Sequence, residues 1–245
     1  MEKNLHYMDF LQPNERINYY YRMGVHADIL DYHGECIDFC GRSIREDQAD
    51  SSQKAYALIT LFNAYISLDD LILAEYCLKE YENSRYADFR KKHFRAVLYT
   101  KRGRFAEAIQ LYKECLQEAE RDRRISVVSD LLEVYLEIGR NDLIKELIDS
   151  EADFLPANIN IHPYRIKVAA RYFKRKGVCQ LSAGLTNEGF DSLLQSITYY
   201  RQLGDSEKAM QCIGLFLRHH RLSGKSLSFE HMEKIDKICH NEANE

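Results

Sequence analysis

The chain has 245 residues, 45% hydrophobic and 29% charged, so it can bury a core and does not have the composition of a disordered protein. Its net charge of −4 does not suit general binding to nucleic acid. The first residues lack the apolar run of a signal peptide, and no later run is long enough to cross a membrane, so we expect a cytoplasmic protein.

The apolar residues follow a helical period. They recur at i, i+3, i+4 and i+7 in segments such as 55–66 and 126–138, and only 3 Pro and 11 Gly interrupt the chain. No convincing period-two run indicates a strand. The seven cysteines are odd in number and lie mostly in helical patterns, so we expect buried free thiols rather than disulfides. The predicted fold class is all-α.

The N-terminal region, residues 1–50, is predicted to hold divergent helices. Residues 13–44 resemble a hairpin of two amphipathic helices with Gly24 as the turn. A helix-turn-helix DNA reader is an alternative, but its second helix, residues 26–39, is acidic, which is the wrong sign for the major groove. We therefore expect no direct binding to nucleic acid.

The next part of the chain repeats itself. Tyr65 and Tyr99 are 34 residues apart, Ala74 and Ala108 have the same separation, and Tyr135 follows Tyr99 by 36. A period of 34 residues made of two short helices resembles the tetratricopeptide repeat (TPR). An unrelated helical bundle, which also places Ala and Tyr at helical spacings, is the alternative.

Segment 89–122 matches the repeat best. It supplies the small and aromatic packing positions of that family, namely Ala96, Tyr99, Gly103, Ala108, Tyr112 and Cys115. Segments 55–88, 125–158 and 170–203 match in part, with Gln180 in place of the repeat Tyr in the last one. The chain has no Trp, which departs from the family pattern.

The resemblance implies one right-handed superhelix of about five to six hairpins over residues 1–245. Residues 150–163 contain Pro156 and Pro163 and are predicted to form an irregular connector, followed by C-terminal repeats over 164–245. Two sub-bundles that pivot at this connector, or one continuous solenoid with a packed loop, both fit the pattern. The last pair of helices is expected at 206–222 and 228–240.

In TPR arrays the first helix of each hairpin lines a concave binding face. In this register the inward residues are Tyr56, Asn63, Arg90, His93, Lys101, Arg171, Lys174 and Arg218. Segments 89–104 and 165–176 contain seven and six Lys or Arg and no acid, which favours a ligand with acidic groups or a free carboxylate. Basic residues that only solvate outward helix faces are the alternative, and Glu133 and Glu137 would also face inward.

Asn63 is the strongest single candidate for a ligand contact. Its amide can donate to and accept from a peptide backbone, and it resembles the groove Asn with which TPR receptors hold a peptide main chain. The carboxylate clamp of the chaperone-tail type would need a Lys one turn earlier, where this chain has Ile59.

The sequence contains little that indicates catalysis. His33, Cys36 and Cys40 lie near one face of a predicted helix, but no second cluster completes a zinc site, so we predict no metal and no cofactor. The pair His219-His220 reads as a polar helix end. No phosphate-binding Gly loop or nucleophile motif is present, and we predict that the chain is not an enzyme.

Phrases such as 164–177 and 196–209, rich in Tyr and Lys, resemble the sensor part of Gram-positive and phage peptide-pheromone receptors (the RRNPP group). The resemblance covers roughly 55–222 and implies peptide binding in bacterial or phage quorum sensing, and a homodimer. Those receptors carry an N-terminal effector module, for which residues 1–45 leave too little room. Three functions remain open: a receptor for a short or acidic peptide, an adaptor or scaffold of a multiprotein complex, and a Rap-like response-regulator phosphatase.

Overall fold

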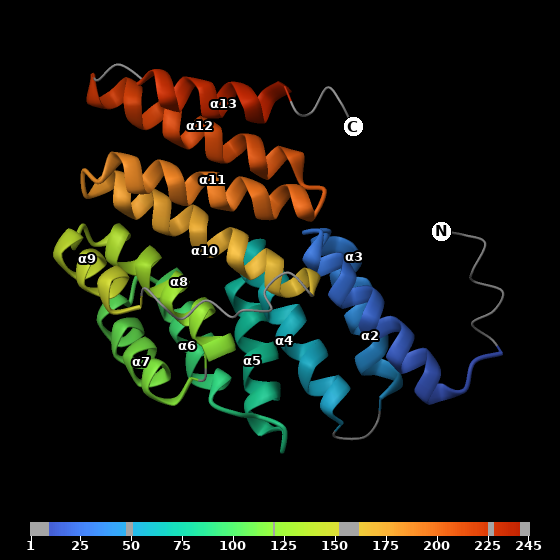
Figure 1. Ribbon diagram of the computed structural model, residues 1–245. Coiled ribbons are helices and arrows are strands. Elements are labelled where there is room, and N and C mark those ends of the chain that lie inside the picture. The colour runs from blue at the N-terminus through green and yellow to red at the C-terminus, as the bar shows by residue number, and fades with distance from the viewer. Residues whose placement is uncertain (1–9, 48–50, 120, 152–161, 225–227, 241–245) are drawn as a thin grey trace. The chain divides into compact units, whose positions relative to one another are not determined.

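The described part of the chain is helical throughout. The computed structural model describes residues 10–47, 51–119, 121–151, 162–224 and 228–240, and these contain twelve α-helices and no strand (Figure 1). The helices are α2 (Pro13–Ile29), α3 (His33–Glu46), α4 (Ser52–Ser67), α5 (Leu71–Asn83), α6 (Arg90–Lys101), α7 (Phe105–Glu118), α8 (Arg121–Glu137), α9 (Asn141–Ser150), α10 (Pro163–Ser182), α11 (Thr186–Gln202), α12 (Ser206–Ser223) and α13 (Phe229–His240). The all-α prediction is confirmed.

The chain divides into two compact units, Met1–Val127 and Val128–Glu245, with the division inside α8. This division lies upstream of the predicted connector at 150–163, most of which falls on residues outside those that the structure describes. Among the described residues, none of the helices combines the length and the apolar character needed to span a bilayer.

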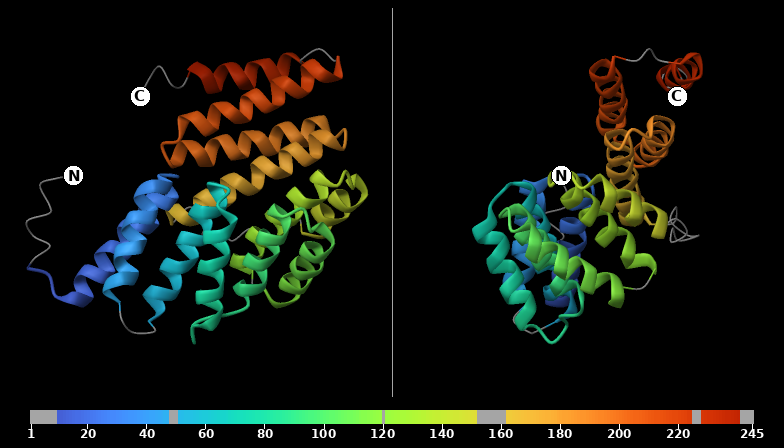
Figure 2. Two further views of the ribbon diagram at one scale, coloured as in Figure 1. Left: turned by 180° about the vertical axis from the view of Figure 1, so that it is seen from behind. Right: turned by 90° about the vertical axis from the view of Figure 1, so that its left-hand side faces the viewer.

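Within each unit, consecutive helices form antiparallel hairpins that stack side by side (Figures 1 and 2). In unit 1, α2 packs on α3, α4 on α5 and α6 on α7; α4 also contacts both α2 and α3 of the preceding hairpin. In unit 2, α12 likewise contacts both α10 and α11. The first helices of successive hairpins are therefore neighbours, which leaves one side of each to face away from its own hairpin.

One turn geometry recurs in five hairpins. The backbone N–H five residues on donates to the carbonyl oxygens of Tyr65, Tyr99, Tyr135 and Gln180 at 2.9 Å, and to that of Ala27 at the same distance. The residue four positions after each of these carbonyls has positive φ. This is the Schellman ending of a helix, and its recurrence confirms the predicted repeat register, including Gln180 at the Tyr position.

The packing positions of the best-matching repeat are buried as predicted. Ala96, Ala108, Tyr112 and Cys115 have no exposed surface. Small side chains let the two helices approach, and the tyrosine fills the space between them.

The first hairpin differs from the prediction at its turn. Gly24 lies inside α2, and the chain turns instead at Asp31, whose φ is 58°. A Cβ at Gly24 would overlap Sγ of Cys40 on α3, so this glycine permits a close helix approach. The prediction of a turn at Gly24 was wrong because a sequence does not distinguish a glycine needed for packing from one needed for a turn.

Candidate binding surfaces on the first helices

In unit 2, α10 has three packed sides. Gly177 packs on Gly189 of α11, Cys179 reaches the Leu132 carbonyl of α8, and Lys174 Nζ donates to Gln211 Oε1 of α12 at 3.2 Å. The fourth side carries Arg171, which is exposed. It faces away from the hairpin partner α11, as the predicted binding side of a first helix should.

The neighbouring helix α12 extends this side. Its residues at i, i+4, i+7 and i+11 are all exposed: Glu207, Gln211, Gly214 and Arg218. Because α10 and α12 are parallel and the contact from Lys174 to Gln211 sets their register, Arg171 and Arg218 lie roughly 15 Å apart along the helix axes. We call Arg171, Lys174, Gln211, Gly214 and Arg218 the α10–α12 face.

The charge on this face is positive and only partly compensated. Gln211 Nε2 donates to Glu207 Oε1 at 3.3 Å, and Arg171 and Arg218 form no ion pair with any described residue. Arg175, next to the face, is paired with Asp130 and Glu133 of α8. Glu133, which was predicted to face inward, thus helps to neutralise Arg175.

In unit 1, three side chains one repeat apart lie on successive first helices. Tyr21 of α2, Tyr56 of α4 and Arg90 of α6 are separated by 35 and 34 residues. The Arg90 guanidinium lies 5.1 Å from the centroid of the Tyr56 ring, which is 39% exposed. This cation–π contact brings together two predicted site residues from neighbouring hairpins.

The charge of Arg90 is compensated inside the protein. Its Nε donates to both carboxylate oxygens of Asp88, at 2.9 and 3.0 Å. Burial opposes the charged form of Arg90, but the hydrogen bonds and charge of Asp88, together with Tyr81 and Tyr56, raise the Arg90 pKa. Arg90 therefore offers an incoming anion less attraction than Arg171 or Arg218.

Asn63 lies on α4 two turns after Tyr56 and is half-buried. Its side-chain amide makes no hydrogen bond with another described residue. The amide donor and acceptor therefore have no internal partner among the described residues.

The other two predicted residues of unit 1, His93 and Lys101, differ from each other in solvent exposure. His93 is only 7% exposed and packs inside its hairpin, with its ring 5.8 Å from that of Tyr112 and stacked on Phe94. This burial does not agree with the expectation that His93 faces the groove, because α6 turns that side toward α7. Lys101 is exposed at the end of α6.

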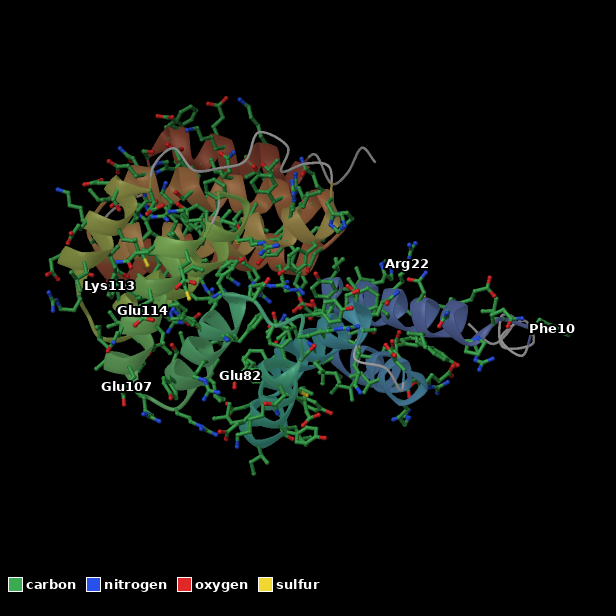
Figure 3. All side chains as sticks on the ribbon, turned by 90° about the horizontal axis from the view of Figure 1, so that it is seen from below. Phe10, Arg22, Glu82, Glu107, Lys113 and Glu114 are labelled. Atoms are coloured by element: carbon green, nitrogen blue, oxygen red, sulfur yellow. The ribbon has the colours of Figure 1, made fainter. Side chains whose placement is uncertain are left out.

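Most of the basic segment 89–104 is paired with acids of second helices. Lys92 Nζ lies 3.3 and 2.7 Å from carboxylate oxygens of Glu114 and Glu118 on α7, and Arg95 is paired with Glu82 of α5. Figure 3 shows Glu114 on α7, together with Glu107 and Lys113. The cation-rich segment therefore links hairpins as well as facing solvent.

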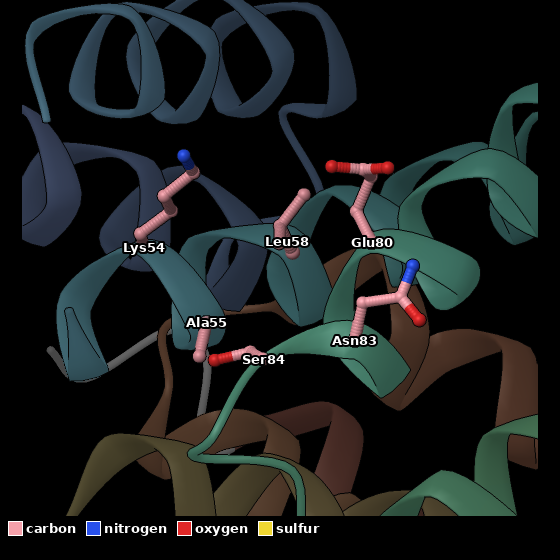
Figure 4. A pocket seen from close by; sticks show the side chains of 6 residues that line it. All are labelled: Lys54, Ala55, Leu58, Glu80, Asn83 and Ser84. Atoms are coloured by element: carbon pink, nitrogen blue, oxygen red, sulfur yellow. The ribbon is translucent and has the colours of Figure 1, made fainter. Parts of the chain in front are cut away.

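A pocket of about 200 Å³ lies where the start of α4 meets the end of α5. Figure 4 shows its lining by Lys54, Ala55, Leu58, Glu80, Asn83 and Ser84. It combines one cation with one anion and contains none of the predicted site residues, so its chemistry does not indicate a ligand class.

Among the described residues, no three His, Cys, Asp or Glu side chains gather where a metal ion could be held. Cys36 and Cys40 of the weak zinc motif are fully buried on α3. A hydrogen bond with Cys36, together with burial, raises the pKa of the Cys40 thiol. Both behave as small core residues.

Three members of these surfaces were not predicted from the sequence: Gln211, Gly214 and Tyr21. Gln211 lies 37 residues after Lys174, near the repeat period, and Tyr21 lies 35 before Tyr56. The period was thus a usable signal for both Gln211 and Tyr21. Tyr21 was not predicted because the repeat pattern was recognised only from residue 55 onward.

No protein-family model matches the chain, and no curated protein sequence matches it. Among solved structures, that of Pseudomonas aeruginosa PilF is similar over 90% of this chain and 98% of its own, at 19% identity and a TM-score of 0.51. A putative kinesin light chain from Podosopora anserina with TPR-like repeats is similar over 88% of this chain and 99% of its own, at 13% identity and a TM-score of 0.44. Together with the recurrent turn, the likeness to PilF shows a fold of TPR-like helical hairpins.

Proposed function

We propose that this protein is a non-catalytic binding module that holds a short or extended peptide with acidic groups on the first helices of its repeats. The single observation that carries the proposal is the α10–α12 face. Arg171 and Arg218, predicted from two separate segments, are exposed on two neighbouring helices, and the half-buried Lys174 lies between these helices. Separate carboxylates of one peptide can reach Arg171 and Arg218 without breaking an internal ion pair, so little binding energy is lost to rearrangement.

Unit 1 supports the same function with a different chemistry. Asn63 offers an amide to a peptide main chain, and the ring of Tyr56, backed by Arg90, offers an apolar surface to a side chain. These contacts suit an extended segment of either charge.

More narrowly, we propose that the protein is a cytoplasmic sensor of a peptide signal. The resemblance to peptide-pheromone receptors implies that such a sensor is a homodimer. The cysteines whose side chains the structure describes are buried and free, which supports a reducing compartment: Cys36, Cys40, Cys77, Cys115, Cys179 and Cys212.

The proposal is tested by fluorescence anisotropy on the full chain. A library of labelled hexapeptides to decapeptides, with either acidic or neutral side chains and either a free or an amidated C-terminus, is titrated at two salt concentrations. Acidic peptides with a free carboxylate should bind best, with an affinity that falls as salt rises. The double variant Arg171→Ala/Arg218→Ala should weaken binding by about 10-fold or more, because charge-assisted hydrogen bonds are each worth roughly 1.5–3 kcal/mol.

Lys113→Ala is the matched control, because Lys113 is an exposed cation on a second helix. It should leave affinity unchanged. Asn63→Ala reports separately on unit 1 and should weaken peptides of both charges alike. Binding that is indifferent to peptide charge and to the double arginine variant would contradict the proposal.

A scaffold that docks folded proteins is the second candidate function. The observation that favours it is a set of large apolar side chains on unit 1 that are exposed to solvent, including Ile72 and Tyr76 of α5. Co-purification of a protein partner that survives Asn63→Ala and the double arginine variant would favour the scaffold.

A further inference from the structure

Large apolar side chains are exposed around the first two interhelical turns of unit 1. They come from the α2–α3 turn, the α4–α5 turn and the first turns of α5: Leu30, Tyr32, Leu68, Ile72, Leu73 and Tyr76. We call these six residues the turn-edge surface. Ile72 and Tyr76 are 81% and 60% exposed and stand one helical turn apart, so they form a continuous apolar strip.

The two turns lie at the same end of unit 1. The first helices α2 and α4 run side by side in the same direction, so both end at this edge (Figures 1 and 2). The two hairpins are also in direct contact here, because α4 packs on both α2 and α3. The turn-edge surface therefore spans two hairpins.

The charge around this surface is negative on balance. Glu75 is paired with Arg102 and Lys79, and Asp38 with Arg42, whereas Glu35 and Asp69 form no ion pair with any described residue. Residues 27–41 contain four acids and residues 62–78 contain three, and neither segment has a Lys or Arg. Glu35 in the first turn of α3 and Asp69 in the α4–α5 turn are both exposed. An apolar centre with an acidic rim is complementary to a partner with apolar anchors and basic flanks.

An aspartate occupies the positive-φ position of each of the two turns, and this conformation costs energy. Asp31 and Asp69 have φ of 58° and 59°, in the left-handed region, where the equivalent turns of the next three hairpins have Gly103, Gly139 and Gly184. A non-glycine residue in this conformation costs about 1 kcal/mol. Carboxylates thus occupy both turns of the acidic edge although glycine would be the less strained choice.

We infer that the turn-edge surface docks a basic amphipathic helix of another protein, which places apolar side chains on Ile72 and Tyr76 and Lys or Arg beside the acidic rim. This function is separate from peptide binding on the first helices, because it needs the opposite charge in the partner and uses a different side of the repeats. A second copy of the chain would bring two acidic rims together, which opposes a symmetric dimer here. The chain's own last residues, 241–245, contain two Glu and no basic residue, so they do not fit the rim either.

The test is selection from a displayed library of random 18-residue peptides on the full chain, followed by anisotropy with the purified selected peptides. We expect enriched sequences with apolar residues at i, i+4 and i+7 flanked by Lys or Arg. Affinity should fall about 10-fold or more in the variant Ile72→Ser/Tyr76→Ser and in a peptide with Glu in place of its basic residues. Because both side chains are exposed, the variant should unfold at the same temperature as the parent protein.

The variant Leu222→Ser/Phe229→Ser is the matched control, because these residues of unit 2 are 74% and 78% exposed. It should bind the selected peptides as the parent does. Acidic or unpatterned enrichment, equal binding to both variants, or a self-association that Ile72→Ser/Tyr76→Ser abolishes would each overturn the inference. The variant Arg171→Ala/Arg218→Ala should bind the selected peptides with unchanged affinity. A failure of this inference can therefore be distinguished from a failure of acidic-peptide binding on the α10–α12 face.

Discussion

Asp88 joins the end of the second hairpin to the start of the third. Its carboxylate accepts hydrogen bonds from the Tyr81 hydroxyl at 3.0 Å, from Arg90 Nε and, at 3.3 Å, from Arg123. Burial alone would raise the Asp88 pKa, but hydrogen bonds from the side chain and backbone of Arg90, the Arg90 charge and the Tyr81 hydroxyl hold it below its ordinary value. One acid thus orients Tyr81, Arg90 and Arg123.

The variant Asp88→Asn should lower the free energy of unfolding by roughly 1–3 kcal/mol at pH 7, because charged hydrogen bonds are lost and Arg90 stays half-buried. A carboxyl group with a depressed pKa contributes stability above its unfolded pKa, near 4, and loses it as pH falls. Urea unfolding should therefore show a smaller difference between parent and variant at pH 3 than at pH 7. Asp142→Asn, at a solvent-exposed pair with Arg140, is the control and should change the midpoint little. An equal difference at both pH values would contradict this role of Asp88.

At the scale of elements, α10 and α11 depend on two glycines where their backbones meet. A Cβ at Gly177 would lie 2.9 Å from the Gly189 carbonyl oxygen and 2.8 Å from Leu193 Cγ. The hairpin that orients Arg171 and Lys174 therefore requires glycine at this position.

Gly177→Ala should destabilise the protein by about 1–2 kcal/mol, because overpacking outweighs the gain in helix propensity. Gly214→Ala on α12 is the matched control, since a Cβ there meets nothing within 4 Å, and it should stabilise by roughly 0.5–1 kcal/mol. Chemical denaturation measures both. If both substitutions changed the free energy of unfolding in the same direction, helix propensity rather than packing would govern the two positions.

The last helix, α13, docks through a buried histidine. His231 packs 4.4 Å from the Phe190 ring of α11 and 5.3 Å from the Phe216 ring of α12, and its Nδ1 is buried without a hydrogen-bond partner. Burial and the neighbouring His220 lower the His231 pKa. Asp191 on α11 and Glu230 on α13 act in the opposite direction, while Lys234 on α13 adds to the lowering.

A histidine with a lowered folded pKa contributes stability above its unfolded pKa, near 6.5, and loses it as pH falls. Amide exchange of residues 229–238 should therefore become faster at pH 5.5 than at pH 7.5, after correction for intrinsic rates, while α10 changes less. His231→Phe should remove this dependence. Protection of α13 that does not change with pH would contradict the assignment.

At the scale of the whole molecule, both units bury thiols. Burial raises the pKa of Cys77 and Cys179 to about 12 and that of Cys115 to about 11. A thiol with a raised folded pKa contributes stability below its unfolded pKa, near 9, and loses it as pH rises.

The free energy of unfolding should therefore fall between pH 8 and pH 10.5, by up to about 1.4 kcal/mol per pH unit for each such thiol. Urea unfolding across this range measures the fall, and Cys115→Ala/Cys179→Ala should flatten it. Among the residues that the structure describes, the buried thiols of Cys36, Cys40, Cys77, Cys115, Cys179 and Cys212 should also react slowly with a thiol reagent until the chain unfolds. Rapid reaction of any of these six at pH 8, located by mass spectrometry, would contradict their burial.

The sequence was sufficient to predict the helices and their register, because the 34-residue period fixes which residues meet. Tyr99, Gly103 and Ala108 all have the predicted roles. The periodicity could not show that Arg90 is neutralised by Asp88, since this pairing depends on a connection outside the repeat pattern. Nor could it show the burial of His93, which depends on how α6 is rotated against α7.

The central claim is that an acidic peptide binds the α10–α12 face, and photo-cross-linking on the full chain tests it most directly. An acidic peptide from the anisotropy panel carries a benzophenone, and mass spectrometry locates the cross-link. We predict cross-links within 163–182 and 206–223 that disappear in Arg171→Ala/Arg218→Ala. Cross-links on α3 or α5, or cross-links that persist in this variant, would contradict the account.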